Sequence, residues 1–407
     1  MSSLINRPEY LEQLIANRDT DLVKIVTGIR RCGKSSLLEL YREYLLDSGV
    51  PKENIIFMNL ESLRWRDLTD YLSFYDYVSS LIPKEGITYL IFDELQAVDH
   101  WEKAIESFRL DYHVDIYITG SNAFLLSSEY STLLSGRSVE IRMLPLSYRE
   151  FLTFYDFESG TTQEEKFQKY LQFGGMPVLK DYHFNEARIN QVLEGIYSTV
   201  ILKDISMRNS QVDQNTLQKL VRFLCSNIGS STSPNRIGGV LASEGEIQKG
   251  NRLAGKTVDR YITMLHKAYL FYPVERYDIK GRQLLKTMEK NYIVDIGFRN
   301  LILGYRDADR GHILENIVYL ELLRRDYRVY TGKVGEAEVD FVAEKPADKM
   351  YIQVTETMES PETRERELRP LRQIPDNYEK IVLSMDRSFL RSQEGIRILN
   401  LIDWLLS

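Results

Sequence analysis

Apolar positions in the first 120 residues form short continuous runs, separated by stretches with helical spacing. The runs predict four strands, at residues 22–27, 54–59, 89–92 and 114–119. The spacing predicts two helices, at residues 8–17 and 34–46. Strands that alternate with helices are typical of a parallel sheet covered by helices on both faces. This part of the chain is therefore predicted to be an α/β domain.

The pattern changes twice after residue 150. Residues 151–206 have helical spacing, interrupted at Phe173-Gly174-Gly175-Met176-Pro177, where Gly and Pro predict a turn between two helices. Amphipathic helices are predicted at 216–227 and 257–269, with a strand at 269–274. The last hundred residues combine one helix with alternating strands. They are predicted at 312–325 for the helix and at 328–330, 338–343, 350–354 and 380–384 for the strands.

Length and composition exclude several classes of protein. The 407 residues are 43% hydrophobic and 27% charged, which excludes a disordered chain and predicts more than one hydrophobic core. A net charge of −7 excludes a uniformly basic nucleic-acid coat but is compatible with a basic patch. Cys32 and Cys225 lack the spacing of a metal site or a disulfide framework. No signal peptide or membrane-spanning run is present, so we expect a cytoplasmic protein.

The strongest motif is a phosphate-binding loop. Residues 28–35 read GIRRCGKS, which matches G-x-x-x-x-G-K-[ST] directly between a predicted strand and a predicted helix. Glycine lets the backbone approach phosphate oxygens, and unpaired amides at the helix N-terminus face the anion. Lys34 would contact the β- and γ-phosphates, and the hydroxyl of Ser35 would complete the shell of a Mg²⁺ ion. The predicted ATP- or ADP-binding residues are Gly28, Arg30, Arg31, Cys32, Gly33, Lys34, Ser35 and Ser36, with Arg30 and Arg31 expected to anchor the loop.

A second motif follows the strand at 89–92. Its apolar run ends in Asp93 and Glu94, two carboxylates at the tip of a buried strand. Together with the phosphate loop, this pattern predicts that Asp93 holds Mg²⁺ and that Glu94 acts as general base on the attacking water. Two adjacent carboxylates favour hydrolysis of the nucleotide over binding alone.

Two further positions have alternative interpretations. Ser121 or Asn122, after the strand at 114–119, could orient the attacking water, or could form a plain turn. Arg137 could reach the γ-phosphate bound by a neighbouring copy, which would require a homo-oligomer, or could be a structural arginine.

Five segments together resemble a known family, the bacterial and archaeal AAA-type ATPases that carry a C-terminal domain of unknown function. The segments are GIRRCGKSS, YLIFDELQ, ITGSNAFLL, LSGRSVEIRMLPLSYREFL and LQFGGMPVL. The resemblance implies that Asn122 is the first sensor residue and that Arg137 is an arginine-finger candidate. It also implies that Gly174-Gly175-Met176-Pro177 is a family hallmark in a helical lid beside the nucleotide.

Residues 213–292 read as a winged helix-turn-helix. The helix at 257–269 has an apolar face, and Lys256, Arg260, Thr263 and Lys267 lie on its other face, with a wing expected at 278–282. Such residues could contact phosphates of double-stranded DNA, or could form a solvated face of a protein-contact domain.

The last hundred residues resemble the PD-(D/E)xK nuclease core. Glu315 and Asp340 fit its acidic positions, and Glu338 precedes the second. Gln353 and Thr355 stand where a second carboxylate and a lysine are expected. Because metal binding and water activation need those groups, we expect a retained fold with lost or weak cleavage.

These observations predict an α/β protein with four parts. They are a P-loop NTPase core with a parallel sheet at 1–150, a helical lid at 151–206, a winged helix-turn-helix at 207–300, and a degenerate α/β restriction-endonuclease-like domain at 301–407. The predicted function is Mg-dependent ATP hydrolysis by a molecular switch. The alternatives are a nucleotide-regulated DNA-binding regulator with little turnover, and a nuclease.

Overall fold

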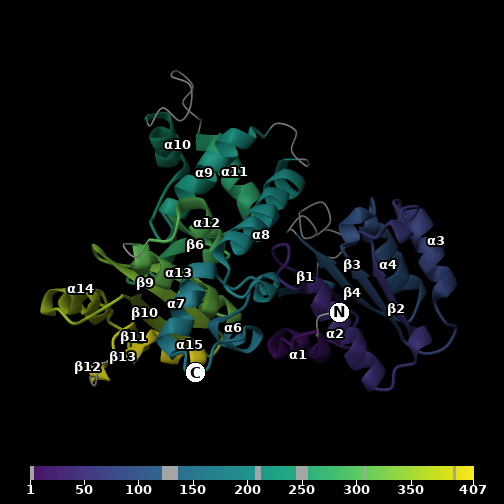
Figure 1. Cartoon of the computed structure of the whole chain (residues 1–407), viewed down its shortest axis with the longest axis horizontal. Helices are drawn as coiled ribbons and strands as arrows, with labels where there is room; N and C mark the ends of the chain where they lie inside the picture. Colours follow the sequence, from purple (N-terminus) through teal and green to yellow (C-terminus); the bar gives the residue numbers. More distant parts are fainter. Residues whose placement is uncertain (1–3, 122–135, 207–211, 244–254, 307–308, 388–390) are drawn as a thin grey trace. The chain divides into compact units, whose positions relative to one another are not determined.

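The chain forms two compact units in the computed structural model (Figure 1). The model describes residues 4–121, 136–206, 212–243, 255–306, 309–387 and 391–407. We call Met1–Pro145 with Lys267–Tyr269 the N-terminal unit, and Leu146–His266 with Leu270–Ser407 the C-terminal unit. The division at Pro145 lies close to the boundary predicted at residue 150.

A five-stranded sheet forms the centre of the N-terminal unit. Its strands are, in spatial order, β2 (Ile55–Asn59), β3 (Thr88–Asp93), β4 (Val114–Gly120), β1 (Val23–Thr27) and β5 (Ser138–Arg142). All neighbouring strands are parallel, which confirms the predicted parallel sheet. The four predicted strands are present, and β5 is an additional edge strand beside β1.

Helices cover this sheet because side chains of a strand alternate between its faces. The four helices are α1 (Pro8–Ala16), α2 (Lys34–Asp47), α3 (Tyr71–Leu81) and α4 (Trp101–Asp111). Phe74 of α3 and Phe108 of α4 pack on Phe92 of β3 in one aromatic core. Tyr41 of α2 packs against Tyr117 of β4, whose side chain belongs to the other face.

The C-terminal unit contains an eight-stranded mixed sheet. In spatial order the strands are β12 (Ser392–Gln393), β13 (Ile396–Asn400), β11 (Glu379–Ser384), β10 (Asp348–Val354), β9 (Ala337–Lys345), β8 (Arg328–Val334), β6 (Phe271–Asp278) and β7 (Gln283–Ile293). Strands β6 and β7 form the antiparallel hairpin of the predicted wing. Since β6 also pairs with β8, the sheet crosses the boundary predicted at residue 300. Pairing with both neighbours extends β6 to Asp278, beyond the predicted strand end at 274.

Ten helices of the C-terminal unit have described boundaries. They are α6 (Tyr148–Phe154), α7 (Gln163–Phe173), α8 (Glu186–Thr199), α9 (Gln214–Ser226), α10 (Pro234–Ser243), α11 (Gly255–Lys267), α12 (Ile296–Leu303), α13 (Arg310–Arg324), α14 (Pro361–Arg372) and α15 (Leu401–Leu406). Helices α9 to α11, followed by the hairpin, have the element order expected of a winged helix-turn-helix. The winged helix-turn-helix and its contact with DNA both stay predictions.

The Gly-Gly-Met-Pro turn is a close-packed junction within the C-terminal unit. The amides of Gly175 and Gly297 donate to the two carboxylate oxygens of Asp295, at 2.7 and 2.8 Å. A Cβ on Gly174 would lie 2.0 Å from Asp295 Oδ1, and one on Gly175 would lie 2.4 Å from the carbonyl oxygen of Leu146. Both glycines are therefore required by packing, and Asp295 joins the end of α7 to the start of α12.

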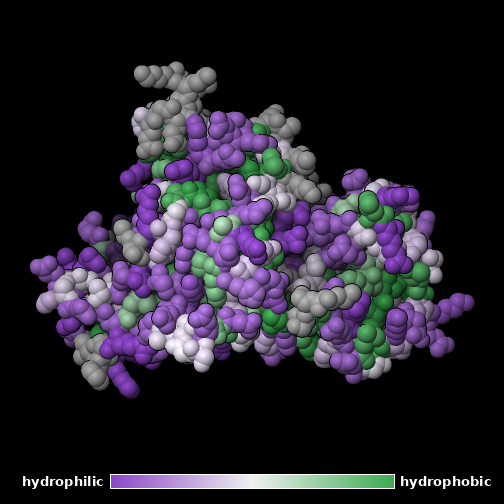
Figure 2. Space-filling model, in the orientation of Figure 1, coloured by the Kyte–Doolittle hydropathy of each residue, from purple (hydrophilic) through white to green (hydrophobic). Residues whose placement is uncertain are grey.

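The surface is predominantly polar over much of the face shown in Figure 2. Exposed large apolar side chains include Leu63, Leu72 and Leu110 of the N-terminal unit. Among the described helices, none has both the length and the hydropathy that a membrane span requires.

Candidate nucleotide site

The phosphate loop follows β1 and requires glycine at two positions. Gly28 has φ +140°, and a Cβ there would lie 2.2 Å from the carbonyl oxygen of Met143. Gly33 has φ +107° and forms the N-cap of α2. The loop therefore reverses tightly and delivers the chain to the N-terminus of a helix, where backbone amides lack intrahelical partners and the helix dipole is positive.

The ammonium group of Lys34 lies inside this loop. Its side chain is buried, and its Nζ donates to the carbonyl oxygens of Gly28 at 2.9 Å and Ile29 at 3.2 Å. Ser35 and Ser36 follow on the first turn of α2 and are exposed. The loop thus holds a cation among its own carbonyls and presents two hydroxyl groups beside it.

Arg7 anchors the loop from outside it, a role that sequence analysis missed. Its buried guanidinium donates to the carbonyl oxygens of Cys32 at 3.2 Å, Leu144 at 2.8 Å and Pro145 at 3.4 Å. Cys32 is completely buried, so its side chain serves packing. No local signal marks Arg7, because its partners lie far along the chain.

The two arginines of the loop differ in their surroundings. Arg30 reaches Glu61, which follows β2, with Nη1 3.4 Å from Oε1. Arg31 is exposed, with φ +66°. The expected anchoring is therefore supplied by Arg7, while Arg30 links the loop to the segment after β2.

Asp93 ends β3 at the same sheet edge as the loop. It is completely buried, and both carboxylate oxygens are bound by neighbouring strands. Asn59 of β2 donates to Oδ2 at 2.7 Å, and the hydroxyl of Thr119 on β4 donates to Oδ1 at 2.5 Å. The carboxylate is thus fixed in orientation by Asn59 and Thr119, two residues that the motif did not identify.

Glu94 adopts a left-handed backbone conformation next to Asp93, with φ +55° and ψ +47°. The hydroxyl of Thr119 also accepts from the Glu94 amide at 2.9 Å, and Gln96 donates to the Glu94 carboxylate. Burial raises the pKa of Glu94, although the nearby ammonium of Lys34 opposes this shift. A carboxylate with a raised pKa is better matched to accepting a proton near neutral pH.

The other predicted catalytic positions have different outcomes. Ser121 follows β4 and is buried, and its Oγ has no hydrogen-bond partner within the described part of the chain. Asn122 lies outside the described residues. Its sensor role stays a prediction.

Arg137 lies where the strands β1 and β5 begin, whereas the phosphate loop lies where β1 ends. It directly precedes β5, and its carbonyl accepts from Val23 at the start of β1, whereas the loop follows the end of β1. Its guanidinium is half exposed and forms an ion pair with Glu106 of α4. The structure therefore does not bring Arg137 to the phosphate loop of its own chain.

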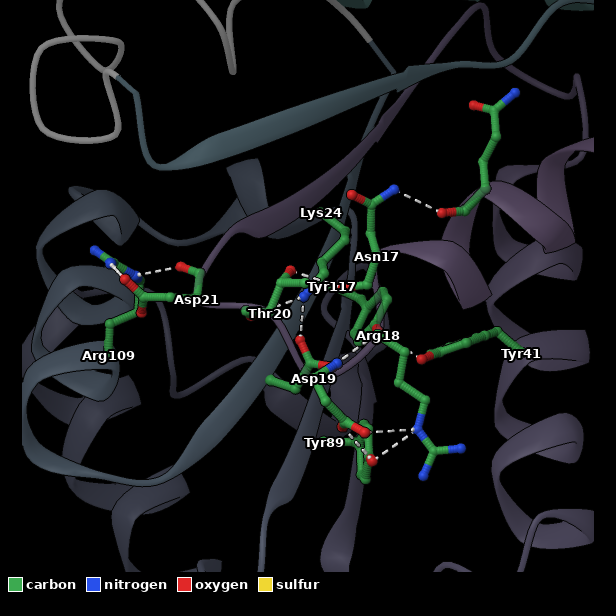
Figure 3. A network of polar contacts seen from close by, with 12 residues as sticks. Asn17, Arg18, Asp19, Thr20, Asp21, Lys24, Tyr41, Tyr89, Arg109 and Tyr117 are labelled. Atoms are coloured by element: carbon green, nitrogen blue, oxygen red, sulfur yellow. Dashed lines mark hydrogen bonds and ion pairs between the residues drawn. The ribbon is translucent and has the colours of Figure 1, made fainter.

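A polar network joins β1 and β4 next to residues 17–22, the segment between α1 and β1 (Figure 3). The ammonium of Lys24 is completely buried and pairs with Asp115, which also accepts from the hydroxyl of Tyr117 at 2.9 Å. Burial lowers the pKa of Lys24, and Asp115 opposes this shift. Removal of one partner would leave a buried charge, so this pair fixes the position of β1, which carries the loop.

A second cluster, in the C-terminal unit, contains the predicted nuclease residues. Lys290 of β7 is buried and lies 2.8 Å from Glu315 Oε1 and 2.9 Å from Glu338 Oε1. Burial opposes its charge, yet Glu315, Asp340 and Glu338 together raise the pKa of Lys290 above its usual value. Burial also raises the pKa of Asp340, and Glu315 adds to this shift. Lys290 was not identified from the sequence.

The side chains of Gln353 and Thr355 form hydrogen bonds with backbone groups in this cluster. Oε1 of Gln353 accepts from the Asp340 amide at 3.2 Å, and the Thr355 hydroxyl donates to the carbonyl of Thr357 at 3.2 Å. Within the described residues, no group of three or more His, Cys, Asp or Glu side chains is arranged to hold a metal ion.

Family models match two parts of the chain. Residues 20–152 match an AAA domain, and residues 164–309 match a domain of unknown function. The first range includes the phosphate loop, Asp93 and Glu94.

Similar proteins occur in bacteria and archaea. An uncharacterized protein of Haemophilus influenzae is 39% identical over 99% of both chains. An uncharacterized protein of Methanocaldococcus jannaschii is 26% identical over 84% of this chain and 80% of its own. Among solved structures, a Walker-type ATPase of Pyrococcus abyssi superposes with a TM-score of 0.51 at 15% identity, covering 73% of this chain and 95% of its own. That likeness concerns the fold alone.

Proposed function

The chain belongs to one family with the Haemophilus influenzae protein, and its residues 20–152 match an AAA domain. From this premise we propose that it is an AAA-type P-loop ATPase that binds Mg·ATP and hydrolyses it to ADP and phosphate. The observation that carries the proposal is the common sheet edge. The phosphate loop follows β1, and a fixed Asp93 ends β3 with the buried Glu94 directly after it, with only β4 between these strands.

The residues present fit the phosphates of a nucleotide and a magnesium ion. The two glycines leave a cradle that a Cβ would fill, and Lys34 has its ammonium within the loop. Ser35 and Asp93 supply the oxygen atoms that magnesium prefers. Bound magnesium would neutralise charge on the phosphates.

Each chain residue has a defined task in hydrolysis. Lys34 exchanges its contacts with the Gly28 and Ile29 carbonyls for the β- and γ-phosphates. Glu94 orients the attacking water and accepts its proton. The single hydroxyl group of Thr119 donates to the Asp93 carboxylate and accepts from the backbone amide of Glu94, so it fixes the acid of one residue and the backbone of the other.

Two substitutions in the full-length chain test this function. Lys34→Ala removes the phosphate contact, so ATP affinity falls at least tenfold. Glu94→Gln retains ATP binding but lowers the hydrolysis rate by about 10²–10⁴-fold, the usual contribution of a general base. Binding is measured by calorimetry with Mg·ATP, and turnover by phosphate release.

The matched controls are Lys52→Ala and Glu85→Gln, which change the same residue types at exposed positions of the N-terminal unit. Both controls should behave like the wild type. The assignment fails if the wild type binds no ATP, or if Glu94→Gln hydrolyses ATP at the wild-type rate.

The C-terminal acidic cluster is proposed to be inactive in DNA cleavage. Lys290 places a positive charge between Glu315 and Glu338, and Gln353 is engaged with the backbone of β9. Supercoiled plasmid incubated with the full-length chain and Mg²⁺ or Mn²⁺ should therefore stay intact. Nicking that disappears in Asp340→Asn would contradict this proposal.

A further inference from the structure

A cavity of about 450 Å³ lies in the C-terminal unit, beside α9, the segment after it, and α10. We call it the α9–α10 pocket. Its charged lining residues are Lys219 and Arg222 of α9 and Arg236 of α10, and no carboxylate contributes to the lining. None of the three cations forms an ion pair within the described parts of the chain, although the charge of Lys219 interacts with the nearby carboxylate of Asp213. The described lining of the pocket thus has a net positive charge.

Hydroxyl groups and the side-chain amide of Asn227 form the rest of its polar lining. The Oγ of Ser231 is shielded from solvent and has no hydrogen-bond partner among the described residues. Thr232, also in the lining, is 8% exposed. An unpaired buried hydroxyl is costly, so a ligand that accepts a hydrogen bond from Ser231 would remove this cost.

The backbone around the pocket is fixed by β7. The Gly229 amide donates to the carbonyl of Asn291 at 3.4 Å, and the Thr232 amide donates to that of Glu289 at 3.0 Å. A Cβ on Gly229 would meet Glu315 Oε2 at 2.9 Å, so the segment packs closely there. The pocket is therefore pre-formed, which lowers the entropic cost of binding.

Helix α10 adds a further favourable term for an anion. It begins at Pro234, next to the pocket-lining segment, and Ser233 accepts from the Arg236 amide at 3.4 Å. The N-terminal end of a ten-residue helix has a positive dipole. Cations, hydroxyl donors and this dipole all favour the same kind of ligand.

We propose that the α9–α10 pocket binds a phosphate group, held by Lys219, Arg222 and Arg236 and by the hydroxyl of Ser231. Arginine pairs with phosphate through two parallel hydrogen bonds, and a tetrahedral oxyanion accepts from several donors at once. The phosphate comes either from a nucleic-acid backbone or from a small phosphorylated compound. The pocket shares no residue with the phosphate loop.

The test compares two double variants of the full-length chain. Arg222→Gln with Arg236→Gln removes two pocket cations, while Arg188→Gln with Arg328→Gln removes two exposed arginines elsewhere in the C-terminal unit. Calorimetry with inorganic phosphate should show at least a tenfold loss of affinity in the pocket variant and less than a twofold change in the control. No phosphate binding by the wild type, or equal affinities of the two variants, overturns the proposal.

Ser231→Ala separates ligand binding from folding. Because its hydroxyl is buried and unpaired, its removal should leave Tm unchanged or raise it, while phosphate affinity falls. A variant that loses Tm and keeps its phosphate affinity contradicts the proposed role of this hydroxyl in binding.

A second measurement identifies the source of the phosphate. For duplex DNA, log affinity falls linearly with log salt concentration. This fall should be less steep by about one in the pocket variant, because one phosphate contact is lost. An unchanged slope with reduced phosphate affinity assigns the pocket to a small phosphorylated compound. The phosphate loop is intact in all these variants, so ATP affinity in the same samples tests the proposed function independently.

Discussion

Gly28 is the residue at which the phosphate loop depends most directly on the absence of a side chain. Gly28 has φ +140°, and a Cβ there would lie only 2.2 Å from the carbonyl oxygen of Met143. Met143 directly follows β5, and its backbone amide donates to the carbonyl oxygen of Thr27 at 2.8 Å. Because backbone on both sides is fixed, a methyl group cannot be accommodated by a rotamer change.

Gly28→Ala should therefore lower both stability and ATP affinity. Displacement of packed backbone costs about 1–3 kcal/mol, in addition to the cost of the backbone conformation. Gly49→Ala is the control, because Gly49 also has a positive φ, of +86°, but has no atom within 4 Å of the added Cβ. Denaturant unfolding should show a clearly larger loss for Gly28→Ala. Equal losses would mean that contact with Met143 is unimportant.

Sequence analysis identified residues whose role is encoded locally. Lys34 and Asp93 stand at fixed positions in short motifs, and the structure brings their elements to one sheet edge. Arg7, Asn59 and Thr119 carry no such signal, because each acts on a partner distant along the chain. They became visible only when the fold placed them beside the loop and the acids.

At the scale of elements, the predictions succeeded where apolar runs were continuous. Strands β1, β3 and β4 are buried along almost their full length, and β2 alternates between buried and partly buried residues of an apolar run; all four were recognised. Strand β5 (Ser138–Arg142) was missed, because three of its five residues are polar and only Ile141 is buried. It becomes a strand through pairing with β1, which is tertiary information.

Asp295 is the clearest case of one element controlling another. It lies before α12, far along the chain from the Gly-Gly-Met-Pro turn, yet accepts from the Gly175 amide. Burial raises the pKa of Asp295 to about 7, although the amides of Gly175 and Gly297 and the charge of Arg324 oppose this shift. The junction between α7 and α12 therefore depends on a carboxyl group that titrates near neutral pH.

This raised pKa predicts a pH-dependent stability. The folded state binds a proton more tightly than the unfolded state, so the stabilisation is present at low pH and is lost as pH rises through about 7. Between pH 8 and pH 5 the contribution of this group amounts to about 3 kcal/mol. Urea unfolding of wild type and Asp295→Ala across this range should show the pH-dependent difference between them. Parallel pH profiles would exclude a raised pKa at Asp295.

At the scale of the whole molecule, sequence patterns did not predict which strands of the C-terminal unit share a sheet. The hairpin β6–β7 was assigned to a winged helix and the later strands to a separate domain, yet all belong to one eight-stranded sheet. The hairpin and the later strands are joined by a short parallel pairing of β6 with β8. Such pairing depends on contacts between segments about fifty residues apart, which periodicity does not record.

Assembly is the property of the whole molecule on which Arg137 depends. Because Arg137 lies at the sheet edge opposite to its own phosphate loop, it can contribute to hydrolysis only in a neighbouring copy. Its half-exposed side chain is available for such a contact once it leaves Glu106, which retains a second partner in Arg109 at 2.7 Å. The sequence alternative of a structural arginine remains the competing interpretation.

The two interpretations differ in how ATPase activity depends on protein concentration. If Arg137 acts in a neighbouring copy, the rate per chain rises with concentration, and Arg137→Ala removes this rise while ATP affinity is unchanged. The loss at high concentration is about 10³–10⁵-fold for a full arginine finger. Arg109→Ala is the control, since it removes the other partner of Glu106. A rate per chain that is independent of concentration, with Arg137→Ala and Arg109→Ala equally active, would leave Arg137 as the structural partner of Glu106.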